Sequence, residues 1–291
     1  MSLHHSVSKL CFGCEPLGGT DWGNYSISDV EDAVSRAVEL GVNFFDTAGV
    51  YGLGLSEKRL SKVLGPKRHD IFVATKGGLR WSESRSRRRA TITKDSSREA
   101  IKRNIEQSLT NLRVDSLKVF YVHWPDNATP FESTFEYLRE CQERQVIESI
   151  GVSNFPLNNL IETLEFCTID AVQIPGNILD TSRLESFKHI CAVEDISLVT
   201  YNSLASGLLS GKYDRMSQFP ESDRRSRQSG FSGVALRENL ERVDTLGLLA
   251  KELGMSLPQY AIKSLQDLSD VRSTIVGIKN IKQIEEFSQL I

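Results

Sequence analysis

The chain has 291 residues, 40% hydrophobic and 25% charged, which is enough apolar sequence for one large core or two ordinary ones. Its 35 lysines and arginines nearly balance 38 aspartates and glutamates, and a net charge of −3 argues against a general nucleic-acid binder or a polybasic membrane binder. No apolar run reaches the roughly 18 residues of a membrane span, and the N-terminal sequence MSLHHSVSKL has no signal-peptide core. Five cysteines fit reduced thiols better than a disulfide framework. These features predict a globular cytoplasmic protein.

One pattern repeats along the chain: a short apolar run, an amphipathic stretch of helical length, and then the next apolar run. Strands that alternate with helices predict a parallel sheet, and eight such units in this length favour one closed (β/α)8 barrel, a TIM barrel, as a single domain over residues 1–291. The predicted strands are 10–13, 42–46, 71–75, 117–123, 150–153, 171–174, 198–201 and 274–276. The predicted helices lie near 28–40, 56–64, 96–112, 132–144, 156–166, 182–194, 237–253, 257–268 and 280–290.

Two pairs of residues have the composition of a capping box, in which a serine begins a helix and a glutamate follows three residues later. These pairs are Ser28 with Glu31 and Ser96 with Glu99. They predict helix starts at the two serines.

Two connections, near 77–95 and 212–236, are too long for ordinary loops, and long loops on a barrel often wall or cover its site. The first carries five arginines from Arg80 to Arg89. These side chains would suit an anionic substrate, but a run of like charges is more often a solvated, mobile loop. We expect a mobile flap beside the pocket.

Two motifs are incomplete. Gly52-Leu53-Gly54 begins like a dinucleotide fingerprint, but Glu57 stands where the third glycine belongs. Cys11 and Cys14 form a CxxC pair without a second pair at zinc spacing, which favours packing in the core over redox chemistry. The sequence therefore predicts no metal site.

Four ionisable residues lie at or just beyond the carboxyl ends of three consecutive predicted strands, where barrel enzymes hold their sites. Asp46 ends the second strand and Tyr51 follows it, Lys76 lies at the end of the third, and His123 ends the fourth. Taken singly, Asp46 is equally well a strand-end cap and Lys76 a solvated loop residue. Together they predict a general-acid network, in which an ammonium lowers the pKa of a phenol and a carboxylate holds the ammonium.

Several segments occur in an order that resembles the aldo-keto reductase superfamily, from about residue 8 to the C-terminus. They are NFFDTAGVYGLGLSEKRL, ATKGG, YVHWPD, IESIGVSNF, AVQIPGN, YNSLASGLLSGKY and TIVGIKNIKQIEE. YVHWPD, SGLLSGKY and FPESDRR resemble the branch of the inositol-operon reductases and potassium-channel β-subunits. The resemblance implies NAD(P)H-dependent reduction of aldehyde, ketone or small-sugar carbonyls. The alternatives are an aldose dehydrogenase that runs in the oxidative direction and a regulatory barrel that binds cofactor.

The resemblance also implies a role for each of the four residues. Tyr51 would give its proton to the carbonyl oxygen, Lys76 would lower the pKa of that phenol, Asp46 would pair with the lysine, and His123 would orient the carbonyl.

It further implies three groups of cofactor-binding residues. Those expected to hold the nicotinamide are Ser153, Asn154, Gln173 and, beneath the ring, Tyr201. Those expected to wrap the pyrophosphate are Ser203, Leu204, Gly207, Leu208 and Gly211. Those expected at the adenosine end are Gly277, Lys279, Gln283 and Glu286.

The preference between cofactors depends on cations near the adenosine ribose, because NADPH carries a 2′-phosphate there. Lys279 supplies one cation, but Gln283 is neutral where many NADP-specific relatives have arginine. We expect a weak preference for NADPH, with NADH usable. The tryptophans expected to wall the substrate pocket are Trp22, Trp81 and Trp124, although Trp81 fits ordinary loop packing as well.

Overall fold

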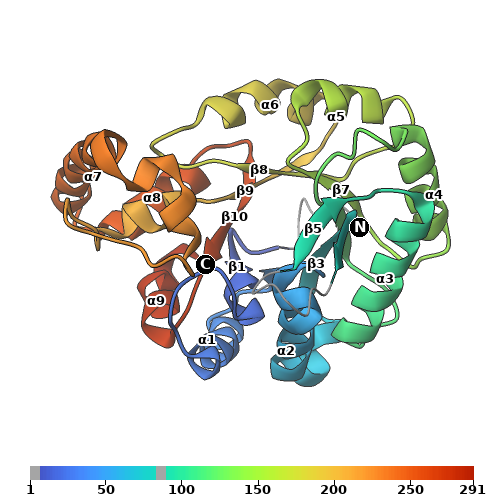
Figure 1. Cartoon of the computed structure of the whole chain (residues 1–291), viewed down its shortest axis with the longest axis horizontal. Helices are drawn as coiled ribbons and strands as arrows, with labels where there is room; N and C mark the ends of the chain where they lie inside the picture. Colours follow the sequence, from blue (N-terminus) through green and yellow to red (C-terminus); the bar gives the residue numbers. More distant parts are fainter. Residues whose placement is uncertain (1–6, 83–89) are drawn as a thin grey trace.

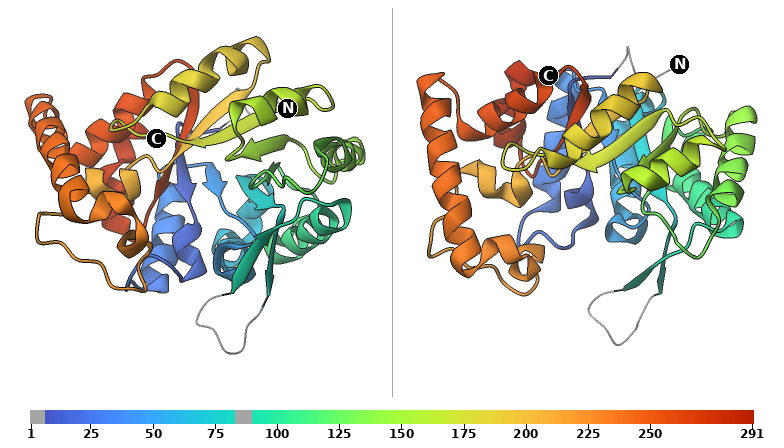
Figure 2. Two further views of the ribbon diagram at one scale, coloured as in Figure 1. Left: turned by 45° about the horizontal axis from the view of Figure 1, so that its top comes forward. Right: turned by 90° about the horizontal axis from the view of Figure 1, so that it is seen from above.

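The structure is a computed structural model that describes residues 7–82 and 90–291. Eight parallel strands close into a barrel in the order β1-β10-β9-β8-β7-β6-β3-β2, with helices around it (Figures 1 and 2). This confirms the predicted TIM barrel. The barrel strands are β1 (Leu10–Gly13), β2 (Phe44–Asp46), β3 (Phe72–Gly77), β6 (Val119–Val122), β7 (Ile150–Ser153), β8 (Ala171–Pro175), β9 (Ser197–Tyr201) and β10 (Val271–Gly277).

The α-helices of the described residues match the nine predicted segments to within a few residues. They are α1 (Ile27–Glu39), α2 (Leu55–Leu64), α3 (Arg98–Leu112), α4 (Phe131–Glu143), α5 (Leu157–Leu164), α6 (Ser182–Val193), α7 (Gly233–Glu252), α8 (Leu257–Gln266) and α9 (Ile281–Glu286). Near-continuous apolar strands form because helices cover the outside of the sheet and side chains fill its inside. Cys11, Phe44 and Tyr121 pack within the barrel, whereas Phe12 and Phe45 face the helices.

The two predicted helix starts are wrong by one or two residues. The hydroxyl of Ser26, not that of Ser28, caps α1, and that of Ser97, not that of Ser96, caps α3. A cap must precede the first helical residue, and Ser28 already lies within α1, while the Ser96 N–H is bound by a carboxylate elsewhere. A complete capping box forms instead at Ser256, before α8.

The first long connection contains an unpredicted hairpin, made of β4 (Leu79–Ser82) and β5 (Thr91–Lys94), which projects from the barrel (Figure 2). Its strands are short and mostly exposed, so they lack the apolar run that marks the barrel strands. Arg80 lies on β4 and donates to Asp95 at 3.0 Å. The other arginines of the run fall at 85–89, outside the described residues.

The second long connection is folded rather than irregular. It contains the short helices η5 (Arg224–Arg227) and η6 (Ser229–Phe231), and α7 begins at Gly233. Phe219 packs edge-to-face on Phe231, with ring centroids 5.2 Å apart, and anchors the segment.

Both thiols of the CxxC pair, Cys11 and Cys14, are buried, and burial raises the pKa of each well above its usual value. This agrees with the packing role expected for them. Within residues 7–82 and 90–291, no helix combines the length and the apolarity of a membrane span.

Candidate active site

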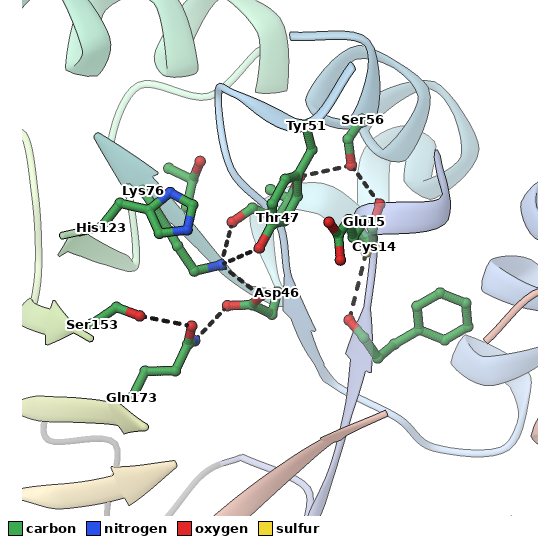
Figure 3. Close-up of polar contacts among 12 residues, drawn as sticks. Cys14, Glu15, Asp46, Thr47, Tyr51, Ser56, Lys76, His123, Ser153 and Gln173 are labelled. Carbon is green, nitrogen blue, oxygen red and sulfur yellow. Dashed lines mark hydrogen bonds and ion pairs between the residues drawn. The ribbon is translucent and has the colours of Figure 1, made fainter. Parts of the chain in front are cut away.

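A buried ion pair lies at the carboxyl end of the barrel (Figure 3). Lys76 Nζ donates to Asp46 Oδ1 at 2.6 Å, to the Thr47 carbonyl at 2.8 Å and to Tyr51 Oη at 3.4 Å. The Lys76 side chain is fully buried and that of Asp46 is 5% exposed. The structure therefore brings three of the four predicted residues together.

Register between β2 and β3 explains this arrangement. Asp46 pairs with Ala74, so the chain leaving β2 runs beside the end of β3. The Thr47 N–H donates to the Ala74 carbonyl at 2.8 Å, and the Gly49 N–H donates to the Lys76 carbonyl at 3.4 Å. Tyr51 then starts the short helix η2 (Tyr51–Gly54), which places its ring centroid 5.0 Å from the lysine nitrogen.

The pKa of Tyr51 is raised well above 10, first by burial and then by the carboxylates of Asp46 and Glu15. These raising effects therefore outweigh the lowering expected from Lys76. The Lys76 ammonium is 2.6 Å from Asp46 Oδ1, which neutralises its charge, whereas it is 3.4 Å from the phenol oxygen of Tyr51. Tyr51 consequently keeps its proton across the neutral range and has it available to donate.

His123, the fourth predicted residue, presents its ring edge-on to Tyr51, with centroids 5.9 Å apart. Burial, and then the Lys76 charge, lower the pKa of His123 well below 6.5. The imidazole is therefore neutral near pH 7 and offers one N–H donor. Its backbone carbonyl accepts from Asn154 Nδ2 at 2.9 Å, which fixes the end of β6 to that of β7.

The residues expected at the nicotinamide form a polar chain from the ion pair. Gln173 Nε2 donates to Asp46 Oδ2 at 2.7 Å, and Ser153 Oγ donates to Gln173 Oε1 at 3.3 Å. Asn154 Nδ2 donates to Ser153 Oγ at 3.1 Å, while Asn154 Oδ1 accepts from Tyr201 Oη at 2.5 Å. All four expected residues therefore join the network that holds Lys76.

The residues expected at the pyrophosphate lie on one tight turn around the short helix η4 (Ala205–Ser210). Several of their donors are already used within the protein. Ser203 Oγ donates to the Ile275 carbonyl at 3.0 Å, and the Gly207 N–H donates to the Leu204 carbonyl at 2.8 Å. Leu208 is buried in this turn, and Gly211 ends it with a positive φ of 68°.

Lys279, expected at the adenosine end, lies against two aromatic rings. Its Nζ donates to the Trp22 carbonyl at 2.8 Å and is 4.9 Å from the ring centroid of Tyr25. Burial, and then the nearby Arg225, lower the pKa of Lys279 to about 8.

The other residues expected at the adenosine end are held by neighbours. Gln283 Oε1 accepts from the Lys279 N–H at 2.8 Å, and Glu286 accepts from Ser256 Oγ at 2.6 Å. Gly277 ends β10 with an exposed position. Lys279 and Gln283 are thus brought together, while the Glu286 carboxylate is bound to the start of α8.

The three tryptophans separate into two groups. A Cβ added at Gly49 would lie 3.6 Å from the ring of Trp81, on β4, and Trp124 is 39% exposed beneath the Lys94 ammonium, which is 5.1 Å from its ring centroid. Both lie at the hairpin, Trp81 on β4 and Trp124 against Lys94 of β5. Trp22 instead lies under Arg224, whose guanidinium carbon is 5.0 Å from the indole centroid.

Sequence reasoning missed an ion pair at the mouth of the barrel. Glu15 starts the short helix η1 (Glu15–Gly18) directly after β1, and Arg224 Nη1 donates to its Oε1 at 2.9 Å and to its Oε2 at 3.1 Å. Burial raises the pKa of Glu15, against the opposing effect of Arg224. An acid at the carboxyl end of a barrel strand is the signal that identified Asp46, and Glu15, two residues beyond β1, offers nearly the same signal.

Known proteins resemble this chain in sequence and in fold. A sequence model of the Aldo/keto reductase family matches residues 9–291. Aldo-keto reductase YhdN of Bacillus subtilis is 29% identical over 98% of this chain and 85% of its own length. A probable voltage-gated potassium channel subunit beta of Oryza sativa subsp. japonica is 30% identical over 96% of this chain and 86% of its own. These matches confirm the resemblance stated from the motifs.

A solved structure agrees in fold as well as in sequence. The glycerol dehydrogenase AKR11B4 from Gluconobacter oxydans superposes with a TM-score of 0.90 at 27% identity, and the match covers 98% of this chain and 86% of that one. The chain therefore belongs to the aldo/keto reductase family and is an oxidoreductase that reduces carbonyl groups with a nicotinamide cofactor.

Proposed function

We propose that the enzyme reduces small aldehydes and ketones to alcohols, with Tyr51 as the proton donor and NADPH as the slightly preferred cofactor. One observation carries the proposal. The buried Lys76 ammonium contacts Tyr51 Oη while Asp46 and the Thr47 carbonyl hold it in place. A carbonyl oxygen that gains negative charge needs such a positioned acid.

The residues beside this site fit a nicotinamide. A carboxamide both donates and accepts hydrogen bonds, and the side chains of Ser153, Asn154 and Gln173 offer both kinds of group in one linked set. The Tyr201 ring lies next to them, tied to Asn154 by its hydroxyl. When bound, the cofactor supplies the hydride.

The protein's own groups handle the proton. Tyr51 gives its phenolic proton to the substrate oxygen, and Lys76 stabilises the phenolate that this leaves. Since Asp46 already fixes the ammonium, little rearrangement accompanies the transfer. The neutral His123 donates its N–H to the same oxygen and orients the carbonyl.

The weak preference for NADPH follows from the charges near Lys279. Arg225 is also close, but its guanidinium is held by the buried carboxylate of Asp223, which offsets its charge. With Gln283 neutral, Lys279 supplies a cation for a 2′-phosphate, worth about ten- to thirtyfold in affinity.

A second candidate is oxidation of alcohols or sugars by the same residues. The glycerol dehydrogenase of similar structure favours it, because the acid that protonates an alkoxide in one direction accepts the alcohol proton in the other.

A panel of aldehydes, ketones, small sugars and polyols, followed by cofactor absorbance with NADPH and NADH and with their oxidised forms, tests the proposal. We expect the highest kcat/KM for carbonyl reduction with NADPH. Turnover confined to oxidation would replace the proposal with the second candidate, and turnover with none of these compounds would contradict both.

A further inference from the structure

The Glu15–Arg224 ion pair lies beside the proposed proton donor without belonging to the network around Lys76. Two short helices meet at this point: η1, which begins with Glu15, and η2, which begins with Tyr51. A Cβ on Gly52 would lie 2.2 Å from the Gly18 carbonyl oxygen, and one on Gly18 would lie 2.8 Å from the Gly52 nitrogen. The two backbones are therefore in direct contact, and the position of Glu15 is fixed relative to Tyr51.

The Glu15 side chain lies in the same region as Tyr51 in the close-up of the site (Figure 3). Its charge also raises the pKa of the Tyr51 phenol, which places the two groups within electrostatic reach of each other. A substrate bound at Tyr51 is thus also within electrostatic reach of Glu15.

Arg224 is the partner of Glu15 in this ion pair. Both Glu15 oxygens accept from the single nitrogen Nη1, so Glu15 occupies one corner of the guanidinium. The side chains are 30% and 39% exposed, so a ligand can reach both. Stacking on Trp22 and a hydrogen bond from the Arg224 N–H to the Asp21 carbonyl at 3.0 Å hold the arginine in place.

The chemistry of the pair suits a neutral polar group. A carboxylate only accepts hydrogen bonds and a guanidinium only donates them, while their charges cancel. Glu15 repels an anion and Arg224 repels a cation. A hydroxyl group satisfies both, since it donates to Glu15 and accepts from Arg224 at once.

We propose that Glu15 and Arg224 form a subsite that binds a substrate hydroxyl next to the carbonyl, so that the preferred substrates are short hydroxyaldehydes and hydroxyketones. This inference rests on the proposed carbonyl reduction and specifies its substrate class. The subsite discriminates through a hydrogen bond to a charged group, which a substrate without the hydroxyl leaves unmade.

The test compares glyceraldehyde with propanal, which share a three-carbon aldehyde skeleton and differ in their hydroxyls. The readout is the ratio of the two kcat/KM values, because a hydroxyl also changes the intrinsic reactivity of the carbonyl and this effect is common to every variant. We expect Glu15→Leu and Arg224→Leu each to lower the ratio about tenfold or more. Turnover of glyceraldehyde should fall more than that of propanal in both variants, since propanal never uses the subsite.

Two further variants keep the result interpretable. Glu15→Gln preserves the shape of the side chain and should lower the ratio less than Glu15→Leu, because an amide still accepts a hydrogen bond. Glu140→Leu breaks the Arg98–Glu140 pair on the protein surface and should leave the ratio unchanged.

The outcomes distinguish failure of the hydroxyl subsite from failure of carbonyl reduction. An unchanged ratio in Glu15→Leu and Arg224→Leu, or equal losses for both aldehydes, would overturn the hydroxyl subsite and leave carbonyl reduction intact. Failure of the wild-type enzyme to reduce either aldehyde would overturn the proposed function and this inference with it.

Discussion

Lys76 Nζ and Asp46 Oδ1 lie 2.6 Å apart at the carboxyl end of the barrel, where neither side chain is more than 5% exposed. Two charges taken out of water are costly unless each satisfies the other. Here the Thr47 carbonyl and Gln173 Nε2 complete the hydrogen bonding of the pair. The pair therefore positions the ammonium for Tyr51, and its integrity is also a requirement of the fold.

Replacing Asp46 with asparagine should destabilise the protein strongly. The change leaves the Lys76 ammonium buried without a counter-charge, which typically costs about 3–5 kcal/mol. Guanidinium-induced unfolding measures the loss. As the matched control, Glu148→Gln breaks the partly exposed Lys118–Glu148 pair, which is 2.8 Å long, and should cost less than about 1 kcal/mol. Equal losses in the two variants would show that the Asp46 charge is not needed to keep Lys76 buried.

The preference for NADPH should weaken as the pH rises. Burial lowers the pKa of Lys279 to about 8, so the free enzyme loses this positive charge between about pH 7 and 9. Of the two protonation states of Lys279, only the charged one attracts the 2′-phosphate. The ratio of the two dissociation constants, for NADH over NADPH, should therefore fall by up to about tenfold over this range.

Fluorescence titration with both cofactors at several pH values measures this ratio. Lys279→Arg keeps its charge throughout and should give a flat profile, whereas Lys279→Ala should give a low ratio at every pH. A wild-type ratio that is independent of pH, or an outright preference for NADH at pH 7, would mean that Lys279 does not face the phosphate.

A buried hydroxyl inside the barrel should be dispensable. Tyr121 Oη is one of two buried side-chain donors without a hydrogen-bond partner among the described residues. Tyr121→Phe removes an unsatisfied polar group, so the free energy of unfolding should stay the same or rise by up to about 1 kcal/mol. By contrast, Tyr25 Oη donates to the Pro16 carbonyl at 2.7 Å, and Tyr25→Phe should cost about 1 kcal/mol. The prediction fails if thermal and chemical unfolding rank the two variants in the opposite order.

The barrel and the grouping of Asp46, Lys76 and His123 were predictable from the sequence. Parallel strands buried on both faces produce apolar runs, and their carboxyl ends must meet at one mouth of the barrel. Polar residues directly after such runs therefore lie close together whatever the loops do. The same rule applies to Glu15, which follows the first strand.

Other features depend on tertiary contacts that no local pattern carries. Arg224 reaches Glu15 across 209 residues, and nothing near either residue indicates the partner. The pKa of Tyr51 rises because its ring is buried, a property of the assembled site rather than of the neighbouring lysine. The hairpin after β3 was missed because its strands are short and exposed. The observed helix starts differ from the predicted ones by one or two residues, because Ser26 and Ser97, rather than the nearby Ser28 and Ser96, cap the helices.

The most direct test of the central claim is the rate of carbonyl reduction by Tyr51→Phe. This variant removes one oxygen, the one that Lys76 contacts, and should leave the thermal unfolding temperature and NADPH affinity close to those of the wild type. Loss of a positioned proton donor costs about 10²–10⁴-fold in rate, and we expect a fall in kcat of that size. Retention of more than about a tenth of the wild-type kcat would contradict the assignment of Tyr51 as the proton donor.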